Sequence, residues 1–262
     1  MKNTINQYDV HTIYHAAAYK HVPLLEANII EAVRNNIFGT KIIAEIAIQN
    51  KVESFNLIST DKAVRPTNIM GATKRLCEKY LQMISKNAKT DFKIVRFGNV
   101  LGSTGSVVPL FEKQIKRGGP ITVTHPEVSR YFMTIREAVE LVLISSQIKH
   151  SKNGNIFILE MGKPVFIKDL AEKMIILSGK DTKNVKIKYT GLRKGEKLNE
   201  QLFFSEEKIE KTGVSGILCV SKIPFQTNMK KFDDFITKLN TIKKKTLVEE
   251  IIKMLPEYKR LS

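Results

Sequence analysis

Short apolar segments alternate with longer segments of helical periodicity along most of the chain. The apolar segments predict strands at residues 9–14, 55–58, 93–97, 121–123, 156–159 and 185–189. Helical spacing predicts helices at residues 23–50, 67–86, 107–116, 135–148 and 167–178, and two charged helices between residues 231 and 255. Strands that alternate with helices are typical of an α/β fold with a mostly parallel sheet. The alternation becomes irregular near Ser103, where we expect a smaller lobe to begin.

Length and composition set limits on the class of protein. A chain of 262 residues, 42% of them apolar, can form one large domain or a domain with a smaller lobe. No apolar segment approaches the ~20 residues that span a bilayer, and the polar start lacks the apolar core of a signal peptide. We therefore expect a cytoplasmic location and no membrane segment in this chain. Cys77 and Cys219 are expected to be free thiols, and the histidines lack metal-ligand spacing, so no metal site is predicted.

The formal charge of +17 raises the question of a polyanionic partner, such as nucleic acid or an anionic membrane surface. The lysines are scattered, however, with small concentrations at residues 180–188 and 243–245, and we find no nucleic-acid-binding motif. We interpret the charge as solvated, lysine-rich faces and expect no nucleic-acid partner. A basic nucleic-acid binder is the alternative, and it would bind with a steep dependence on salt.

Small and polar residues follow three of the predicted strands. They are residues 15–18 (HAAA), 59–62 (STDK) and 98–103 (GNVLGS). Ligands of open parallel sheets bind at the carboxyl ends of the strands, so we expect these clusters to form one site. Lys74 lies four residues after Met70, which places both side chains on one helix face. Taken alone, Lys74 would be interpreted as a surface lysine of a basic helix.

Five segments, in order along the chain, resemble one family. They are residues 15–26 (HAAAYKHVPLLE), 58–74 (ISTDKAVRPTNIMGATK), 96–110 (RFGNVLGSTGSVVPL), 124–134 (THPEVSRYFMT) and 191–200 (GLRKGEKLNE). They resemble the polysaccharide-biosynthesis family of UDP-N-acetylglucosamine 4,6-dehydratases, within the extended short-chain dehydrogenase/reductase superfamily. The resemblance implies a Rossmann-like parallel sheet, with residues 1–102 forming part of an NAD-binding domain. Residues 103–262 would form mostly a substrate-binding lobe, with elements that return to the sheet.

The resemblance also implies an activity, a cofactor and a substrate. The activity would be dehydration of UDP-N-acetylglucosamine to a 4-keto-6-deoxy sugar for surface polysaccharide or glycan synthesis. The cofactor would be NAD, with NADP as the alternative, and the partner would be the UDP-sugar substrate. Asp61 would protonate the leaving C6 hydroxyl, and Lys62 would remove the proton at C5. Thr60 and Lys74 would handle the C4 hydroxyl.

Met70 occupies the position of the tyrosine that short-chain dehydrogenases normally carry. It has no titratable proton, so it cannot be an acid or a base. This substitution resembles the long branch of the family, whose full-length members are attached to the inner membrane and retain configuration at C5.

Further ligand contacts follow from the same motifs. The residues expected to contact or support NAD are Ala16, Ala17, Ala18, Lys20, Asn36, Ser59, Met70 and Lys74. The residues expected to hold the UDP-sugar are Asn99, Ser106, Val107, Arg130, Arg193 and Glu196. Two arginines suit a diphosphate because their planar guanidinium groups bind it bidentately. Alternatively, Val107 is a core residue and Glu196 pairs with Arg193.

The catalytic roles require shifted pKa values. Lysine and aspartate start near ~10.4 and ~3.9, so each pKa must move roughly three units. A dry pocket would lower the pKa of Lys62 and raise that of Asp61 by desolvation, whereas their mutual attraction would oppose both changes. A plain surface ion pair is the alternative interpretation of these two residues.

The Gly-rich turn of a dinucleotide-binding fold is not recognisable in this chain. Family members begin with strands and this turn, which cradles the cofactor pyrophosphate at a helix N-terminus; residues 102–105 come too late to provide it. We therefore expect an unpaired edge on the strand at residues 9–14, weak NAD binding, and little or no activity of the isolated chain. We also expect a homo-oligomer, or completion by an N-terminal half supplied from elsewhere.

Two other functions are alternatives to the dehydratase. One is a related nucleotide-sugar epimerase, which needs no elimination pair, so the adjacent Asp61 and Lys62 argue against it. The other is a non-catalytic remnant that binds UDP-sugars through Asn99, Arg130 and Arg193 but lacks the cofactor cradle.

Overall fold

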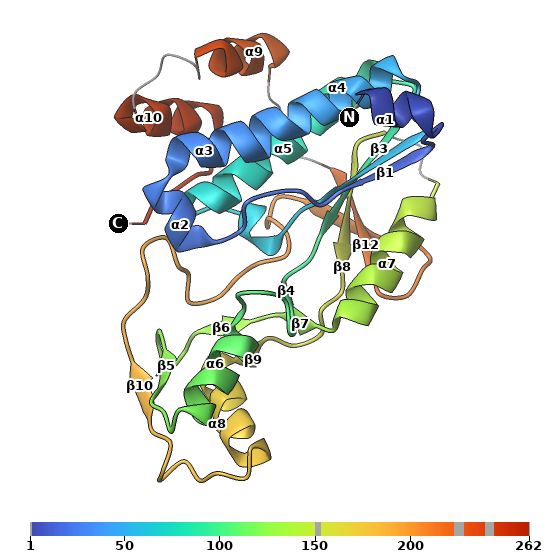
Figure 1. The fold of residues 1–262 in the computed structure, drawn as a ribbon. Helices are drawn as coiled ribbons and strands as arrows, with labels where there is room; N and C mark the ends of the chain where they lie inside the picture. The colour runs from blue at the N-terminus through green and yellow to red at the C-terminus, as the bar shows by residue number, and fades with distance from the viewer. Residues whose placement is uncertain (1, 150–152, 223–227, 239–243, 262) are drawn as a thin grey trace.

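A six-stranded sheet forms the centre of the protein (Figure 1). The computed structural model describes residues 2–149, 153–222, 228–238 and 244–261. In spatial order the strands are β1 (Thr12–His15), β2 (Ser54–Ile58), β3 (Asp91–Arg96), β8 (Asn155–Leu159), β12 (Ile217–Lys222) and β11 (Lys208–Lys211). The first four are mutually parallel, whereas β12 is antiparallel to both β8 and β11. This parallel-dominated sheet confirms the predicted α/β fold class.

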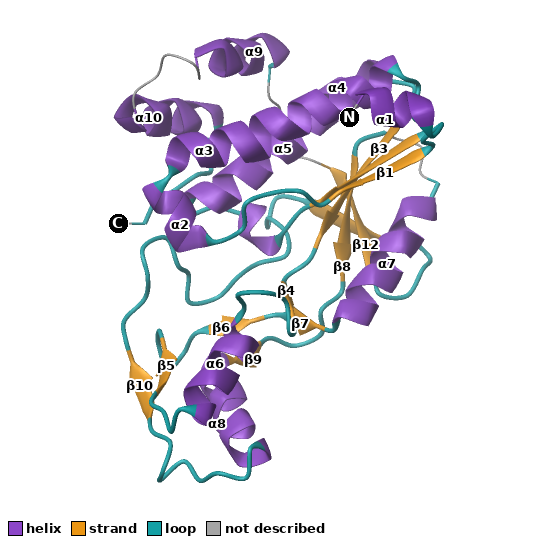
Figure 2. Cartoon of the chain, in the orientation of Figure 1, coloured by secondary structure: helices purple, strands orange, loops and turns teal. Residues whose placement is uncertain are grey.

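Helices cover both faces of the sheet (Figures 1 and 2). One face carries α2 (Val22–Ala27), α3 (Ile29–Val33), α4 (Gly39–Gln49) and α5 (Ile69–Ile84), with α9 (Met229–Lys238) and α10 (Lys244–Met254) outside them. The opposite face carries α7 (Ile135–Gln147). Alternate side chains of β2 and β3, including Phe55, Leu57, Phe92 and Ile94, are buried in a core shared with the first group of helices. Among the described residues, no helix has both the length and the apolar character needed to cross a bilayer.

A smaller layer lies beyond the carboxyl ends of the parallel strands (Figure 1). It contains α6 (Val107–Lys116), α8 (Ile167–Leu177), and the parallel pair of β5 (Ile121–Val123) and β10 (Ile187–Tyr189). Two short pairs join β4 (Asn99–Val100) to β7 (Phe132–Met133), and β6 (Ser129–Arg130) to β9 (Val165–Phe166). An apolar cluster that includes Phe111, Ile121 and Ile175 is separate from the main core. Residues after 103 also supply β8, β12 and β11 to the large sheet, and a domain boundary at residue 103 stays a prediction.

The helix predicted at residues 23–50 is divided. Asn28 separates α2 from α3 because its backbone angles, φ −122° and ψ 58°, are not helical. A π-helical turn, η1 (Arg34–Phe38), then precedes α4. The helical periodicity was recognised correctly, but the two interruptions leave no clear signal in the apolar pattern.

Several strands and one helix also differ from the sequence prediction. The first strand begins at Thr12 rather than residue 9, because Asp9 has a φ of 46°, which a strand cannot accommodate. The strand predicted at residues 185–189 starts at Ile187 and pairs with β5 outside the large sheet. The helix α1 (Lys2–Gln7), the short strands β4, β6, β7 and β9, the strands β11 and β12, and the 3₁₀ turn η3 (Ser85–Asn87) were not predicted.

Candidate active site

The loop after β2 is held at the carboxyl edge of the sheet by main-chain contacts. It forms a 3₁₀ turn, η2 (Asp61–Ala63), and the backbone N–H of Asp61 donates to the carbonyl of Phe97 at 3.0 Å, which ties this loop to the end of β3. A Cβ atom at Gly71 would lie 2.1 Å from the carbonyl oxygen of Lys62. Only glycine therefore allows α5 to pack directly on the turn that presents Lys62.

Asp61 and Lys62 form a direct ion pair within this turn. The Lys62 Nζ donates to Asp61 Oδ1 at 2.9 Å and to Asn99 Oδ1 at 3.0 Å, and the Thr60 hydroxyl donates to the same Asp61 oxygen at 2.9 Å. The Asp61 side chain is fully buried, whereas 19% of the Lys62 side chain is exposed. The alternative of a plain surface ion pair is therefore wrong.

The second carboxylate oxygen of Asp61 is buried without a hydrogen-bond partner among the described residues. It faces Gly98, where an added Cβ would lie 3.1 Å from Oδ2. The two oxygens of Asp61 therefore have different surroundings, because one accepts from Lys62 and Thr60 and the other faces Gly98.

The pKa of Lys62 does not move in the direction predicted from the sequence. Burial alone would lower the pKa, but the charge and hydrogen bond of Asp61, together with the charge of Glu200, outweigh burial and raise it. The expected lowering by a dry pocket is therefore wrong for this arrangement, because the partner is in direct contact. The contact with Asp61 therefore favours the ammonium form of Lys62.

A cleft of about 370 Å³ opens beside this pair. Its lining includes the predicted residues Ala16, Ala18, Lys20, Ser59, Thr60, Lys62, Met70, Lys74, Asn99, Ser106 and Val107. The clusters that follow β1, β2 and β3 therefore share one cleft, as the argument from strand ends predicted. Lys74 is only 7% exposed, and desolvation lowers its pKa. Lys74 is therefore not the surface lysine that its helix pattern alone would suggest.

Three of the predicted cofactor residues are placed differently from the rest. Ala17 is not among the residues that line the cleft. Asn36 is buried and holds Tyr19 from behind, accepting from its backbone N–H at 2.8 Å and donating to its carbonyl at 3.0 Å. The Ser59 hydroxyl donates to Glu78 at 2.6 Å and is therefore directed toward the protein interior. Their roles toward NAD stay predictions.

A second cavity of about 160 Å³ adjoins the cleft and contains all six predicted substrate residues. The two cavities share Asn99, Ser106 and Val107. Glu196 accepts from the Arg130 guanidinium at 3.1 Å and from the backbone N–H of Arg193 at 3.0 Å. The ion pair of Glu196 is therefore with Arg130, and the expected alternative of a side-chain pair with Arg193 is corrected.

Comparison with known proteins decides the family. The profile of the family described as "Polysaccharide biosynthesis protein" matches residues 1–222. The chain belongs to the polysaccharide biosynthesis protein family. This family member is 55% identical, over 204 residues, to the Staphylococcus aureus "Capsular polysaccharide biosynthesis protein CapD", a match that covers 78% of this chain and 34% of CapD. It is also 40% identical, over 199 residues, to a "UDP-glucose 4-epimerase" of Rickettsia canadensis, covering 74% and 56% of the two chains.

Solved structures agree with the fold. The structure of Pen from Bacillus thuringiensis matches with a TM-score of 0.77 and 36% identity, covering 86% of this family member and 70% of Pen. The structure of DesIV, a dTDP-glucose 4,6-dehydratase from Streptomyces venezuelae with NAD bound, has a TM-score of 0.68 over 77% of this chain and 68% of DesIV. At 19% identity, the DesIV likeness shows the Rossmann-like fold alone. The chain spans about a third of the length of CapD.

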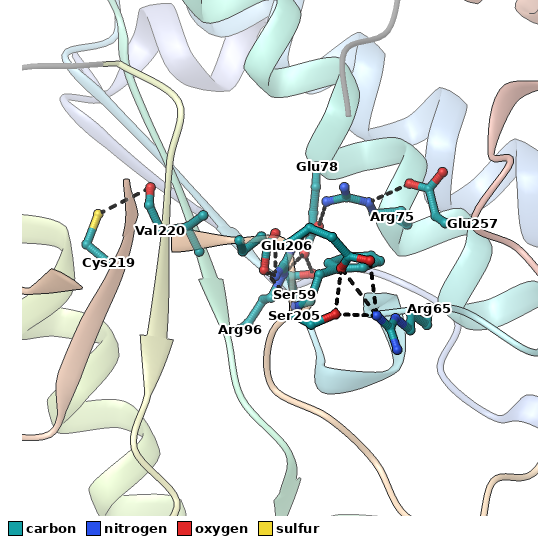
Figure 3. A network of polar contacts seen from close by, with 12 residues as sticks. Ser59, Arg65, Arg75, Glu78, Arg96, Ser205, Glu206, Cys219, Val220 and Glu257 are labelled. Atoms are coloured by element: carbon teal, nitrogen blue, oxygen red, sulfur yellow. Dashed lines mark hydrogen bonds and ion pairs between the residues drawn. The ribbon is translucent and has the colours of Figure 1, made fainter. Parts of the chain in front are cut away.

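A buried ion network adjoins the candidate site of this family member through Ser59, which lines the cleft and donates to Glu78 (Figure 3). Glu78 of α5 accepts from Arg96 through two nitrogens at 2.8 Å, and from Arg75 at 3.0 Å. Arg96 also donates to Glu207, which precedes β11, at 2.8 Å. The network therefore connects α5 and β3, the elements that carry Lys74 and lead to Asn99.

Sequence reasoning missed this network, and it missed Lys197 and Glu200 near the Asp61–Lys62 pair. The Lys197 ammonium donates to the carbonyl of Val64 at 2.8 Å and lies 3.5 Å from a carboxylate oxygen of Glu200, and burial lowers the pKa of Lys197. The available signal for the network was Arg96, a charged residue that directly follows the apolar Ile94 and Val95 in a predicted buried strand. A buried arginine requires a carboxylate partner, but its identity depends on long-range packing.

Proposed function

We propose that this chain provides the elimination site of an NAD-dependent nucleotide-sugar dehydratase. The reaction converts UDP-N-acetylglucosamine to the UDP-4-keto-6-deoxy sugar, for synthesis of a surface polysaccharide or glycan. The observation that carries the proposal is the contact of Asp61 and Lys62 beside the cleft. Loss of water across C5 and C6 requires an acid at the leaving hydroxyl and a base at the adjacent carbon, and this pair supplies both.

The pair must exchange a proton before it can act. The resting ammonium and carboxylate become a neutral amine and acid when one proton moves along the 2.9 Å hydrogen bond from Lys62 to Asp61. In water this transfer costs about 9 kcal/mol, from the difference between the two reference pKa values. A turnover of about 10 per second corresponds to a barrier of about 16 kcal/mol, so that cost would be more than half of the barrier. Burial of Lys62 acts against this cost, but the contact with Asp61 and the charge of Glu200 keep the pKa of Lys62 raised, so binding of the substrate must supply the rest.

The proton on Asp61 needs a route to the substrate because the Asp61 side chain is fully buried. Two groups that bond to its Oδ1 also line the cleft, namely the Thr60 hydroxyl and the Lys62 ammonium. Thr60 can pass its hydroxyl proton to the leaving C6 oxygen while it accepts the proton held by Asp61. We therefore place Thr60 between Asp61 and the sugar, and Lys62 at C5.

The cleft is compatible with a nicotinamide cofactor. The side chains of Ala16 and Ala18 are small enough for a flat ring to approach the backbone, and Met70 provides an apolar surface. Lys74 supplies a buried ammonium for the ribose or for the C4 oxygen. When bound, NAD would supply the acceptor for the C4 hydride and its donor at C6. These residues would orient the ring and the sugar and exclude water from the reacting carbons.

The second cavity suits the UDP portion of the substrate. Arg130 is held by the carbonyl of Leu198 at 2.9 Å and by Glu196 at 3.1 Å, so its guanidinium is oriented before a ligand binds. Arg193, in the loop after β10, lines the same cavity. Two guanidinium groups around one cavity match the two phosphates of a nucleoside diphosphate.

A nucleotide-sugar epimerase is the second candidate function. The relative named UDP-glucose 4-epimerase, at 40% identity, favours it. An epimerase would also oxidise C4, but it would return the hydride to C4 and would not need a base at C5. The Asp61–Lys62 pair is therefore the feature on which the two functions differ.

Mass spectrometry of the product separates these functions. The chain is incubated with UDP-N-acetylglucosamine and excess NAD⁺, alongside the Asp61→Asn and Lys62→Ala variants. A product lighter by one water, formed by the parent and lost in both variants, supports the dehydratase. An isomer of unchanged mass would identify an epimerase. Binding of the UDP-sugar without any turnover, at NAD⁺ concentrations high enough to overcome the weak cofactor binding expected of the isolated chain, would identify a non-catalytic UDP-sugar-binding protein.

A further inference from the structure

The segment after α10, residues 255–261, contacts two helices next to the candidate active site (Figure 1). We call this segment the strap. Its Arg260 donates to a carboxylate oxygen of Glu26 in α2 at 2.8 Å, and its Glu257 accepts from Arg75 of α5 at 3.1 Å. The strap therefore joins α2 to α5, although it lies beyond residues 1–222, which match the family profile.

The strap also pairs with the loop between η2 and α5. The backbone N–H of Lys259 donates to the carbonyl of Pro66 at 3.1 Å, and that of Leu261 donates to the carbonyl of Thr67 at 3.2 Å. Arg65, in the same loop, has a φ of 42°, a left-handed conformation that is costly for a residue with a side chain. Such a conformation persists only where surrounding contacts fix it, and the strap supplies two contacts directly after Arg65.

Glu26 connects two segments that line the cleft. Residues 18–21 line the cleft and lead directly into α2, which carries Glu26. The Oε1 atom of Glu26 accepts from the backbone N–H of Ile69, the first residue of α5, at 2.7 Å. The next residue of α5, Met70, lines the cleft. The Glu26 side chain is only 7% exposed, so this one carboxylate forms a buried link between the two segments.

Capping of α5 does not by itself account for Glu26. Asn68 is the N-cap residue of α5 and accepts from the backbone N–H of Gly71 at 2.8 Å. Glu26 adds a second acceptor from a separate helix, and a bond between two helices fixes their relative position. Two nitrogens of Arg260 hold the other oxygen of Glu26 at 2.8 and 3.3 Å, which orients the carboxylate toward α5.

We propose that the strap sets the spacing of the cleft, with Glu26 and Arg260 as its positioning residues. Arg260 orients Glu26, and Glu26 fixes the start of α5 relative to residues 18–21. Because α5 carries Lys74 and packs through Gly71 on the carbonyl of Lys62, the same contact places both amines of the cleft. This inference deepens the proposed function, and its kinetic test rests on that function.

The first test is an NMR measurement of the Met70 methyl group in the full chain with isotope-labelled methionine methyl groups. Glu26→Gln and Arg260→Gln should each move the Met70 resonance. The double variant should move it no further than the larger single change, because the two residues act as one unit. A loss of stability alone leaves the resonance of the folded chain in place, so this measurement separates positioning from a purely structural role.

Lys259→Gln is the matched control. It removes one positive charge from the neighbouring residue of the strap, but Lys259 contacts Pro66 through its backbone, which the substitution retains. The Met70 resonance of this variant should therefore stay at the parent position.

The second test is the kinetics of water loss from UDP-N-acetylglucosamine with excess NAD⁺. Arg260→Gln should lower kcat at least about 10-fold, because a misplacement of about 1 Å can cost about 100-fold. KM for the UDP-sugar should stay within about two-fold, since residues outside the strap line the second cavity. Arg260→Lys should recover part of kcat because its ammonium can still contact Glu26, and Lys259→Gln should keep the parent values.

An unmoved Met70 resonance in both Glu26→Gln and Arg260→Gln would overturn the proposal. An equal movement in Lys259→Gln would do the same, as would a moved resonance together with an unchanged kcat. If the parent chain forms no dehydrated product, the proposed function fails, whereas the Met70 resonance still decides whether the strap sets the spacing of the cleft. The two failures are therefore distinguishable.

Discussion

Glu78 and Asp61 are both fully buried carboxylates, but their surroundings differ. Each oxygen of Glu78 accepts two hydrogen bonds, from Ser59 and Arg96 at one oxygen and from Arg75 and Arg96 at the other. Asp61 accepts two bonds at Oδ1 and none at Oδ2 among the described residues. Burial would raise the pKa of Glu78, but the charges and hydrogen bonds of Arg96 and Arg75 outweigh it and lower the pKa to about 2.

The difference separates a structural charge from a reactive one. A carboxylate whose lone pairs are occupied by two arginines and a serine keeps its charge and holds the elements around it. A carboxylate with one free oxygen and a lysine that reaches a cleft can change its protonation during a reaction. The same acid-to-amide substitution at the two positions should therefore have opposite consequences.

The largest expected effect is on catalysis at Asp61. Asp61→Asn should lower the rate of water loss by about 10²–10⁴-fold, because the amide cannot donate the proton that the leaving hydroxyl requires. The free energy of unfolding should change by less than about 1 kcal/mol, since Lys62 retains its contact with Asn99 and its access to the cleft. Steady-state kinetics and urea denaturation measure the two quantities. A variant with more than a tenth of the parent rate would contradict the role of Asp61.

The next effect is on stability at Glu78. Glu78→Gln should lower the free energy of unfolding by about 3–5 kcal/mol. The substitution removes a negative charge that neutralises the buried guanidinium groups of Arg75 and Arg96. Urea denaturation of this variant beside Asp61→Asn provides the comparison. Lys173→Ala, at an exposed position of α8, is a control that should change neither stability nor rate. An equal loss of unfolding free energy in Glu78→Gln and Asp61→Asn would remove the distinction between the two carboxylates.

The smallest of the three effects is a dependence of stability on pH. The pKa of Glu78 is about 2 in the folded chain, against 4.5 without the fold, so its stabilisation is complete above pH 4.5 and is lost as the pH falls toward 2. The loss amounts to about 3 kcal/mol. The stability difference between the parent and Glu78→Gln should therefore shrink over this range, as urea denaturation at successive pH values would show. A constant difference would mean that the Glu78 pKa is not lowered.

Local pattern was sufficient to predict most of the elements. The apolar segments at residues 55–58, 93–97 and 156–159 are strands of the large sheet, because short apolar segments between polar clusters have few other stable conformations. The helix at residues 167–178 ends one residue earlier than predicted, and Gly179 follows it with a φ of +73°, as expected of a glycine after a helix C-terminus. β11 was not predicted because its sequence, KIEK, is mostly polar, and its pairing with β12 is a long-range event.

The cleft was predicted more fully than the charge states within it. Parallel strands bring their carboxyl ends to one edge, so Ala16, Thr60 and Asn99 could be placed together from sequence spacing. The direction of the Lys62 pKa could not be obtained that way. It depends on whether the contact with Asp61 outweighs burial, and both are set by how the surrounding segments pack.

The sequence by itself determined the succession of strands and helices and the residue types that follow each strand, because both depend on neighbours along the chain. Only the tertiary structure decided which oxygen of Asp61 has no hydrogen-bond partner among the described residues, and which arginines neutralise Glu78. Those properties depend on atoms from distant segments meeting in space. The energy of a buried charge is set by such neighbours and not by the residues next to it in the chain.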